Sequence, residues 1–588
     1  MTRNFILSAV LYGVVVAGCT DNRPAQLFDT YAEAIDPAPD TTADWSTVAK
    51  GLNVAFGDID SRYAKSSIPT VTATEWTSVA WRGERISAQL VLWAGDAVEQ
   101  VECVFSDFTA SAATLNASIA QARFERYVLT DDGCHKGLEC PSSLSPDMLD
   151  TLSSFNMEAQ TARPVWLSFD IPQDAAEGVY SGILTIYARH RKAQKLKITL
   201  EVLPQTLPPP SEWAFHLDLW QHPTSVARVN GVEPWSEEHW QLLEAPMKLL
   251  ASAGQKVITA TLNEDPWHHQ CYDGYADMIR WKKYKDGSWA YDYTVFDRWI
   301  ALMMRLGINK QINCYSMLPW NYELHYADEA TGEDVKVQAK PGEKPFIELW
   351  TPFLKDFSAH LKSKGWEKIT NIAMDERAPE EMKKLLDFLA GVAPEIGVAF
   401  ADNHKSYKQF TMLRDVCVQL GSRFDDADLA LRRANGLVST CYVCCNPHAP
   451  NTFTFSPLVE SAWLGWYVAS ADFDGLLRWA YNSWNENPLI DTRFSEYWPA
   501  GDCFLIYPNA RSSVRFERLR EGIQDFEKIR ILRQQLALSP DDASRTAIEK
   551  LNQAVATVRL DVKPEIYAAT LNHAKKVLAE VSRIAGAQ

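Results

Sequence analysis

The apolar residues follow two different periods along the chain. Between about residues 71 and 204, short runs alternate apolar and polar positions, as in the segment 178–186 (GVYSGILTI). A period of two is typical of strands with one buried face, and this region predicts a β-sandwich. Its last predicted strand, 195–203, ends at Pro204 and is followed by three prolines at 208–210, which form a stiff joint.

Beyond these prolines, strand-length apolar runs alternate with longer amphipathic stretches. The predicted strands are 214–219, 256–262, 311–317, 369–374, 397–401, 416–420, 437–445 and 475–481. The predicted helices are 237–253, 296–306, 349–364, 380–392 and 457–471. Eight such strands with outer helices predict a (β/α)₈ barrel, which builds its site from the loops after the strands. The competing fold is a doubly wound open sheet, but the sequence offers no glycine-rich phosphate loop to support it.

The start of the chain predicts an export signal. Residues 5–16 are apolar, and Val16-Ala17-Gly18-Cys19 reads as a lipobox similar to those of bacterial lipoproteins. The apolar run is shorter than the roughly 20 residues that a membrane-spanning helix needs. We expect cleavage before Cys19, acylation of that residue, and a membrane-anchored protein in the periplasm or at the cell surface. An ordinary secretory signal with a chance cysteine remains the alternative, and it also exports the protein.

Together these patterns divide the chain into five parts. Residues 1–18 form the signal peptide, and 19–50, rich in Pro, Asp and Thr, form a flexible linker. The sandwich occupies 51–207 and the barrel 208–536. Residues 537–588 form a C-terminal helical segment, rich in Ala and Lys, that we expect to pack on the barrel.

Composition narrows the class of partner. A chain of 588 residues is too long for one hydrophobic core, and its 46% hydrophobic content fits a soluble globular protein. Lys and Arg total 58 against 75 Asp and Glu, which repels polyphosphates and leaves no basic patch. We therefore expect no nucleic-acid partner, and no motif predicts a cofactor.

The cysteines suggest two local features. Cys134 and Cys140 enclose a short loop and are able to pair in an oxidising compartment. Cys441, Cys444 and Cys445 half resemble a metal site, but zinc needs four well-placed ligands and alternation along a strand splits these sulfurs between faces. We predict a buried strand lining and no metal.

Two adjacent acids, Asp375 and Glu376, follow the fourth predicted barrel strand. A strand interior rarely tolerates such a pair, because one carboxylate would be buried without a partner. At the carboxyl end of a barrel strand both acids can lean into one cleft, and we predict the catalytic site here. The alternative is a surface charge cluster or a helix cap, since acids favour a helix N-terminus.

Aromatic and polar residues follow other strands at the same predicted edge. Indoles offer a large apolar face and one N–H donor, which suits the C–H faces of sugars. Trp220, Trp267, Trp320 and Trp484 follow the first, second, third and eighth strands. The chain has 21 tryptophans, so some of them belong to the core. The polar residues predicted to contact the sugar are His222, Asp402, His404 and Tyr442.

Several of these segments resemble glycoside hydrolase family 123. They are 217–223 (LDLWQHP), the Asp375-Glu376 pair, Tyr442-Val443-Cys444-Cys445 and 515–525 (RFERLREGIQD), and the resemblance spans roughly 213–536. It implies an exo-acting, retaining β-N-acetylgalactosaminidase with substrate-assisted catalysis. The late motif also reads as a helix-packing and ion-pair seam, because Glu517 and Arg520 are three residues apart, and we place it outside the active site. The resemblance leads us to expect a proline directly after the acid pair in some relatives, whereas here Arg377 and Ala378 intervene, which puts the neighbouring subsite in question.

The resemblance assigns a role to each acid. The 2-acetamido oxygen of the substrate attacks the anomeric carbon, Asp375 accepts the acetamido N–H, and Glu376 protonates the leaving oxygen and then activates water. The physical argument agrees, because a retaining enzyme with its own nucleophile needs carboxylates about 5 to 5.5 Å apart across the scissile bond, which neighbours do not readily provide. The preference for N-acetylgalactosamine over N-acetylglucosamine rests on the resemblance alone.

Two other functions stay open at this point. One is a non-catalytic glycan-binding lipoprotein that uses the same cleft. The other is a two-carboxylate retaining glycosidase in which Glu376 pairs with Asp402 or Glu264.

Overall fold

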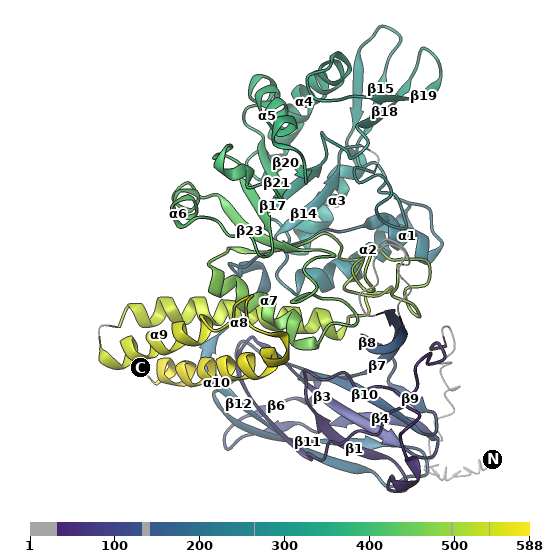
Figure 1. Ribbon diagram of the computed structural model, residues 1–588, viewed down its shortest axis with the longest axis vertical. Coiled ribbons are helices and arrows are strands. Elements are labelled where there is room, and N and C mark those ends of the chain that lie inside the picture. The colour runs from purple at the N-terminus through teal and green to yellow at the C-terminus, as the bar shows by residue number, and fades with distance from the viewer. Residues whose placement is uncertain (1–31, 132–140, 264, 495–497, 540, 588) are drawn as a thin grey trace, which may run out of the picture. The chain divides into compact units, whose positions relative to one another are not determined.

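The computed structural model describes residues 32–131, 141–263, 265–494, 498–539 and 541–587 (Figure 1). The predicted signal peptide, the lipidation site Cys19, the Cys134 and Cys140 pair and Glu264 lie outside the described residues. Within the described residues, no helix is both long enough and apolar enough to cross a bilayer.

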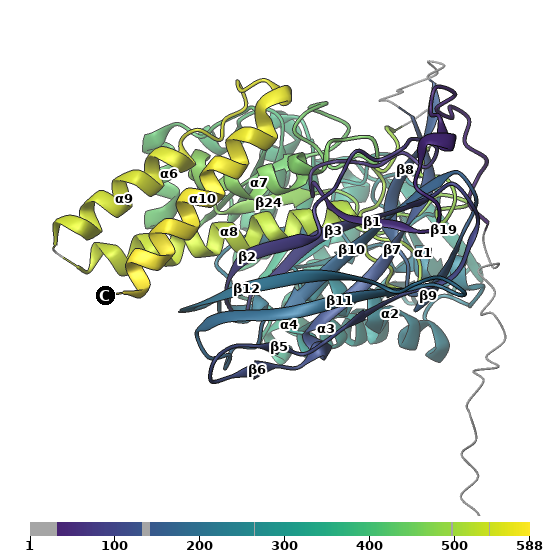
Figure 2. The same ribbon diagram turned by 90° about the horizontal axis from the view of Figure 1, so that it is seen from below.

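The N-terminal region is a sandwich of two sheets, as its period of two predicts (Figure 2). One sheet has the order β1 (Asn53–Gly57), β3 (Arg85–Ala94), β10 (Thr161–Asp170), β7 (Ala120–Asp131) and β8 (Ser142–Leu149). The other has the order β2 (Glu75–Arg82), β12 (Gln194–Thr206), β11 (Gly178–Tyr187), β4 (Val98–Phe105) and β9 (Ser154–Met157), with β5 (Phe108–Thr109) and β6 (Thr114–Leu115) at its side. Burial alternates along β11, so one face of this strand supplies the core.

The second region is an eight-stranded parallel sheet in barrel form. Every predicted strand is present: β13 (His216–Leu219), β14 (Val257–Thr261), β17 (Gln311–Tyr315), β20 (Thr370–Asp375), β21 (Gly397–Asp402), β22 (Asp415–Gln419), β23 (Val438–Val443) and β24 (Gly475–Arg478). Their sheet order is β13, β24, β23, β22, β21, β20, β17, β14. The barrel prediction is confirmed, and the open-sheet alternative is not.

Side-chain amides close the barrel between β13 and β14. The backbone supplies a single bridge between Leu217 and Gln255. Beyond it, the Gln255 carbonyl oxygen Oε1 accepts the Leu219 N–H at 2.9 Å, and Gln221 Oε1 accepts the Thr259 N–H at 2.9 Å. These amides satisfy backbone groups that would otherwise be buried without partners, so we call this the amide seam.

The predicted helices also form. They are α2 (Glu237–Ala251), α3 (Thr294–Arg305), α4 (Lys344–Lys364), α5 (Pro379–Val392) and α7 (Leu458–Ala471), and α1 (Pro223–Asn230) and α6 (Asp426–Ala434) were not predicted. Serines begin two of the longer helices, because the Ser236 and Ser513 hydroxyls accept backbone N–H groups of the first turns of α2 and α8. Helix α8 (Val514–Ala537) crosses α7 closely, and a Cβ at Gly465 would lie 2.3 Å from the Gly522 backbone.

The C-terminal segment forms two helices, α9 (Asp542–Val555) and α10 (Tyr567–Gly586). Both pack on α7 and α8, and α10 also packs on β12 of the sandwich. The segment therefore contacts both the barrel helices and the sandwich, where the sequence predicted the barrel alone.

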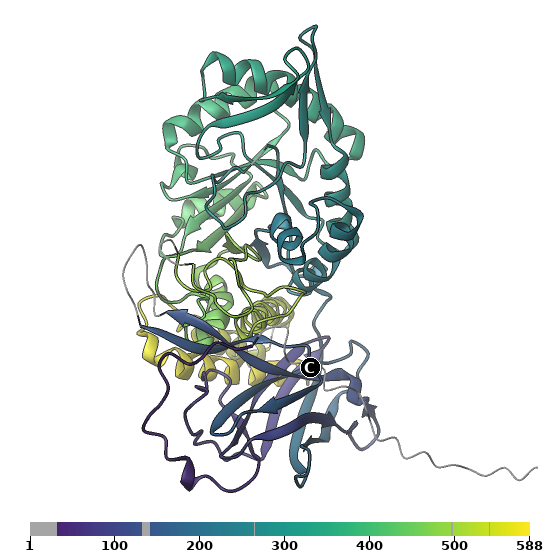
Figure 3. The same cartoon turned by 90° about the vertical axis from the view of Figure 1, so that its right-hand side faces the viewer.

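A small sheet missed by the sequence analysis follows the second and third barrel strands (Figure 3). It consists of β15 (Arg280–Lys283), β16 (Trp289–Asp292), β18 (Glu323–Asp328) and β19 (Glu333–Gln338). The Asp286-Gly287 dipeptide between two short aromatic runs was its local signal, since this pair favours tight hairpin turns.

The motif at 515–525 lies in a buried ion-pair seam, as one interpretation predicted. Glu517 Oε1 accepts hydrogen bonds from Arg123 Nη2 at 3.0 Å and the Ser512 hydroxyl at 2.8 Å. Its other oxygen contacts Arg85 and Arg520. Burial opposes ionisation of Glu517, but the three arginines outweigh it and hold the pKa of this carboxyl well below its usual range.

We expect Glu517→Gln to destabilise the fold by about 3–5 kcal/mol, because it leaves buried arginine charges without a counterion. The urea midpoint at neutral pH measures this loss, with Glu549→Gln on the exposed face of α9 as the matched control. Because the folded-state pKa is depressed, the contribution is present near neutrality and is lost as the pH falls through the acid range. Equal midpoints for the two variants would contradict the prediction.

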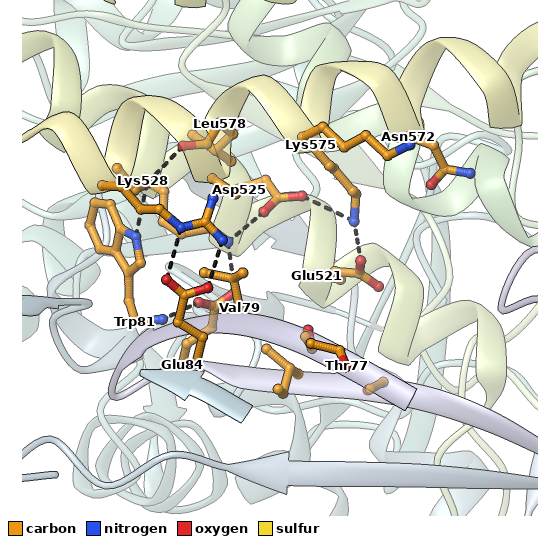
Figure 4. Close-up of a pocket in the computed structure, with 18 residues that line it drawn as sticks. Thr77, Val79, Trp81, Glu84, Glu521, Asp525, Lys528, Asn572, Lys575 and Leu578 are labelled. Carbon is orange, nitrogen blue, oxygen red and sulfur yellow. Dashed lines mark hydrogen bonds and ion pairs between the residues drawn. The ribbon is translucent and has the colours of Figure 1, made fainter. Parts of the chain in front are cut away.

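A hollow of about 500 Å³ lies between the sandwich and helices α8 and α10 (Figure 4). Lys528 Nζ bridges Glu84 at 2.6 Å and Asp525 at 2.8 Å, and Lys575 also contacts Asp525 at 3.2 Å. Acidic and basic side chains thus neutralise one another here, and the residues that line the hollow come from the sandwich, α8 and α10. We interpret the hollow as part of the buried ion-pair seam and not as a substrate site.

Candidate active site

The acid pair lies at the carboxyl end of β20, as predicted. Asp375 is the last residue of the strand, and the Glu376 N–H still donates to the Ala401 carbonyl of β21 at 2.9 Å. Glu376 has a φ of 47°, in the left-handed region that non-glycine residues rarely adopt. In a continued strand the two side chains would point to opposite faces. The backbone leaves the extended conformation here, and both acids line one pocket.

The pair does not cap the helix that follows. Helix α5 begins at Pro379, and its N-cap residue is Ala378, which makes no side-chain cap hydrogen bond. The structure therefore favours the site interpretation over the helix-cap alternative.

Asp375 contacts the second-strand tryptophan. Trp267 Nε1 donates to Asp375 Oδ2 at 3.1 Å. Burial, together with the neighbouring Glu376 charge, raises the pKa of Asp375 to about 7, although the Trp267 hydrogen bond and the Arg377 charge oppose the shift. In the free protein Asp375 therefore holds its proton up to near neutrality.

Glu376 is exposed at the mouth and is held by Tyr442 of β23. The buried Tyr442 hydroxyl donates to Glu376 Oε1 at 2.5 Å. This bond fixes one carboxylate oxygen of Glu376. The structure places Tyr442 in the pocket lining, and its hydrogen-bond partner is one of the two acids.

The pocket around the pair is small, with a cavity volume of about 100 Å³. Its wall is largely aromatic and apolar. The lining residues besides the acids are Trp220, Gln270, Trp320, Ala401, Tyr442, Cys444, Cys445, Leu477, Trp479 and Trp498.

Two groups of aromatic rings, far apart in the sequence, contribute to this wall. Trp220 packs against Trp267 and Tyr315 with tilted rings, whose centroids are 4.8 Å apart in each case. Trp479 and Trp498 have centroids 5.5 Å apart, and the Trp498 N–H donates to the Gln270 carbonyl at 3.0 Å. Indole faces beside two carboxyl groups form a cleft suited to a sugar ring.

Comparison with known proteins identifies the family. The model of the glycoside hydrolase 123 catalytic domain matches residues 220–532, more than half of the chain, and that of the glycoside hydrolase 123 N-terminal domain matches 56–188. The chain belongs to glycoside hydrolase family 123. The protein is therefore a glycoside hydrolase, and family membership favours this over the non-catalytic glycan-binding alternative.

A solved structure supports the assignment. A family 123 glycoside hydrolase from Clostridium perfringens, described in connection with glycolipid glycan hydrolysis, is 28% identical with a TM-score of 0.83, over 91% of this chain and 98% of that one. A GH5 xyloglucanase from Bacteroides ovatus is 10% identical with a TM-score of 0.29, over 80% of this chain and 100% of that one, which is too remote to carry an argument. Comparison with curated proteins gives no match.

Within this family 123 fold, three of the four predicted tryptophans lie beside the acids. Trp220 and the partly exposed Trp320 line the pocket, and Trp267 binds Asp375 from behind. Trp484 is the exception, because it is 1% exposed and its N–H donates to the Ile506 carbonyl at 2.7 Å. The prediction that Trp484 lines the mouth is corrected accordingly.

Three predicted polar residues also lie away from the described pocket lining. His222 is fully buried, with Nδ1 2.5 Å from the Ser225 hydroxyl, and burial lowers its pKa to about 3. The Asp402 carboxylate binds groups of its own turn, where Oδ1 accepts hydrogen bonds from the His404 N–H at 2.8 Å and the Ser406 hydroxyl at 3.1 Å. The His404 side chain is exposed. A polar residue after a strand is often used to satisfy the loop itself.

Sequence reasoning missed Trp479 and Trp498. Trp479 directly follows β24, but the predicted eighth strand extended to residue 481 and placed it inside the strand. Trp498 reaches the pocket from the long loop after β24, and no local pattern indicates such a contact.

The cysteine prediction is partly corrected. Cys441 is buried in β23, as expected of a strand lining, whereas Cys444 and Cys445 follow the end of the strand and are half-buried in the pocket wall. Among the described residues, no cluster of His, Cys, Asp and Glu is arranged to hold a metal ion.

Proposed function

We propose that this family 123 glycoside hydrolase removes terminal β-linked N-acetylgalactosamine, or a related N-acetylhexosamine, with retention of configuration. The observation that carries the proposal is the placement of Asp375 and Glu376, adjacent in sequence, in the wall of one pocket. A two-carboxylate retaining enzyme instead needs its acids about 5 to 5.5 Å apart on either side of the scissile bond. The Asp402 carboxylate, bound by its own turn, does not favour that alternative.

In the proposed reaction the acetamido oxygen of the substrate attacks the anomeric carbon as the glycosidic bond breaks. Glu376 gives its proton to the leaving oxygen, while Asp375 accepts a hydrogen bond from the acetamido N–H and stabilises the positive charge of the oxazolinium. Glu376 then takes a proton from the incoming water, which opens the ring and restores the acid. Tyr442 positions Glu376 throughout, by donating to one carboxylate oxygen.

Substrate binding has to relocate the proton of the pair. In the free protein the raised pKa of Asp375 keeps the proton there until about pH 7. An acetamido N–H that donates to Asp375 favours its ionised form, so the proton of the coupled pair passes to Glu376 in the complex. The free and bound states would then differ in which acid is neutral.

The Clostridium perfringens relative supports glycolipid glycans as one substrate class for this chain. Export and acylation at Cys19 would place the enzyme at a membrane surface, close to such substrates. Release of the Cys19→Ser variant into the soluble fraction, with loss of the lipid mass from the N-terminal peptide, would support this localisation, and an unmodified N-terminus in the original protein would exclude it.

Turnover of aryl glycosides tests the reaction. We expect hydrolysis of the β-N-acetylgalactosaminide in preference to the β-N-acetylglucosaminide, a β-configured first product by NMR, and strong inhibition by a thiazoline mimic of the oxazoline. A trapped glycosyl ester on the protein, with indifference to the thiazoline, would replace the proposal with an enzyme-borne nucleophile.

Arg377 links the acid pair to the loop that carries Trp320. Its guanidinium donates to the Leu318 carbonyl from Nε at 3.1 Å and Nη2 at 2.7 Å, and lies 5.2 Å from the Tyr322 ring centre. The Tyr322 hydroxyl in turn donates to Glu381 of α5. Arg377 is therefore a positioning residue for one wall of the pocket.

We expect Arg377→Met to lower kcat/KM by about ten- to a hundred-fold, because small displacements of positioning groups have effects of this size. The change should appear mainly in KM, because Trp320 would contact the bound sugar and takes no part in the proton transfer. Steady-state kinetics with Arg280→Met, an exposed arginine of β15, as control would test this. An unchanged KM in a folded Arg377→Met variant would refute it.

A further inference from the structure

Cys444 and Cys445 place two neighbouring thiols in the wall of the sugar pocket. Their sulfurs are 4.0 Å apart, both residues are half-buried, and both line the same pocket as Asp375 and Glu376. The other described free cysteines lie outside this pocket lining, and all but Cys103 are buried. The proposed hydrolysis gives these two thiols no role.

The local contacts make the pair reactive. The thiol–thiol hydrogen bond lowers the pKa of Cys445 and raises that of Cys444. Asn446 contacts both sulfurs, with Nδ2 donating to Cys445 Sγ at 3.7 Å and its carbonyl accepting from Cys444 Sγ at 3.7 Å. Two neighbouring thiols in the wall of a pocket are accessible to a small oxidant, and attack on that oxidant proceeds from whichever thiol loses its proton.

We propose that Cys444 and Cys445 form a reversible disulfide between neighbouring residues, and that its redox state sets the affinity of the pocket for its sugar. The oxidant is a low-molecular-weight disulfide. The Cys445 thiolate attacks one sulfur of that disulfide and expels the first thiolate, which takes a proton from water. Cys444 then loses its proton, attacks the Cys445 sulfur and expels the second thiolate. Two protein thiols are oxidised and one disulfide is reduced to two thiols.

Bond formation requires the two sulfurs, now 4.0 Å apart, to approach each other. A disulfide needs its sulfurs about 2.05 Å apart, so the two side chains must approach by about 2 Å. The carbonyl of Cys444 accepts the Asn451 Nδ2–H at 2.8 Å, which anchors the backbone at this point. Because neighbouring Cα atoms lie about 3.8 Å apart, closer than in most disulfides, the peptide between Cys444 and Cys445 has to adjust together with the two side chains.

Oxidation changes the chemistry of the wall. The reduced pair presents two polar thiol groups to the pocket that also holds Glu376. The disulfide is rigid and apolar, so sugar binding no longer requires desolvation of two S–H groups. We expect KM to fall about tenfold on oxidation, the size of effect that one altered contact in a pocket usually has.

The test uses the full chain, equilibrated with oxidised glutathione or with dithiothreitol. We expect the peptide that contains both cysteines to lose the mass of two hydrogen atoms only after oxidation, and KM for the aryl β-N-acetylgalactosaminide to fall. Cys444→Ser, Cys445→Ser and the double variant should have the same KM under both conditions, while the Cys103→Ser control should respond as the original protein does.

Two results would overturn the inference: a fully reduced pair after oxidant treatment, or an oxidised pair with an unchanged KM. The affinity claim rests on the proposed function, but the mass shift does not depend on activity. If the disulfide forms and no amino sugar is hydrolysed or bound, then the substrate assignment fails and the thiol chemistry stands. Binding of the thiazoline, followed by tryptophan fluorescence, separates these cases.

Discussion

Glu376→Gln is expected to lower kcat by about 10²- to 10⁴-fold on substrates with a poor leaving group, because it removes the proposed proton donor to the departing oxygen. Glutamine keeps an oxygen that can accept the Tyr442 hydrogen bond, so the pocket should stay intact. An aryl glycoside with a strongly acidic phenol needs little protonation and should lose much less activity. The ratio of the two losses is the measurement that identifies a general acid.

Glu380→Gln is the matched control, because Glu380 is an exposed acid four residues further along the chain, in the first turn of α5. It should retain full activity. Equal losses on the two kinds of substrate would mean that Glu376 acts in binding and not in proton transfer.

Asp375→Asn is expected to lower kcat/KM by about 10²- to 10³-fold, as loss of a charge that stabilises the transition state usually does. It should also weaken the thiazoline mimic, whose ring carries the same developing charge. The exposed Asp387 of α5 provides the control, as Asp387→Asn. A variant that keeps tight thiazoline binding would show that Asp375 does not contact the acetamido group.

The pH dependence gives Asp375 a second signature. The active free protein holds one proton on the pair, and the pKa of Asp375 is about 7, so kcat/KM should fall as the pH rises through about 7. In Asp375→Asn this limb should no longer lie near pH 7, because the proton can then reside only on Glu376. Stability changes in the same window, because a folded-state pKa above the unfolded value of about 3.9 makes the fold less stable as the pH rises from about 4 to 7. Asp375→Asn should therefore melt at a higher temperature than the original protein at pH values above about 7.

The architecture could be predicted because its signals are local. A period of two identifies the sandwich strands, and short apolar runs between amphipathic stretches identify all eight barrel strands. The position of Asp375 follows from the same pattern, since a barrel strand ends where its apolar run ends. The hairpins of the small sheet have half-exposed faces and weaker patterns, and only the Asp286-Gly287 turn indicated one of them.

The pocket wall was harder to predict because it depends on contacts between distant loops. The Trp498 N–H reaches the Gln270 carbonyl across more than two hundred residues, and no sequence pattern encodes that pairing. His222 and Trp484 followed strands as a rim residue should, but the packing between strands and loops buried both. Position after a strand therefore predicts the correct edge of the barrel, and tertiary packing decides which side chains reach the opening.

Ligand binding is expected to stabilise the barrel at the amide seam, where side chains connect β13 and β14. Trp220 and Trp267 lie in the loops that follow β13 and β14, the two strands that the amide seam connects. Their rings pack against each other near the acids. A sugar bound against Trp220 would stabilise the contact between these two strands. Local opening of the barrel should therefore be slowest when the enzyme holds a ligand. We expect deuterium uptake at Leu219 and Thr259 to slow in the presence of the thiazoline, and uptake indifferent to it would separate the seam from the site.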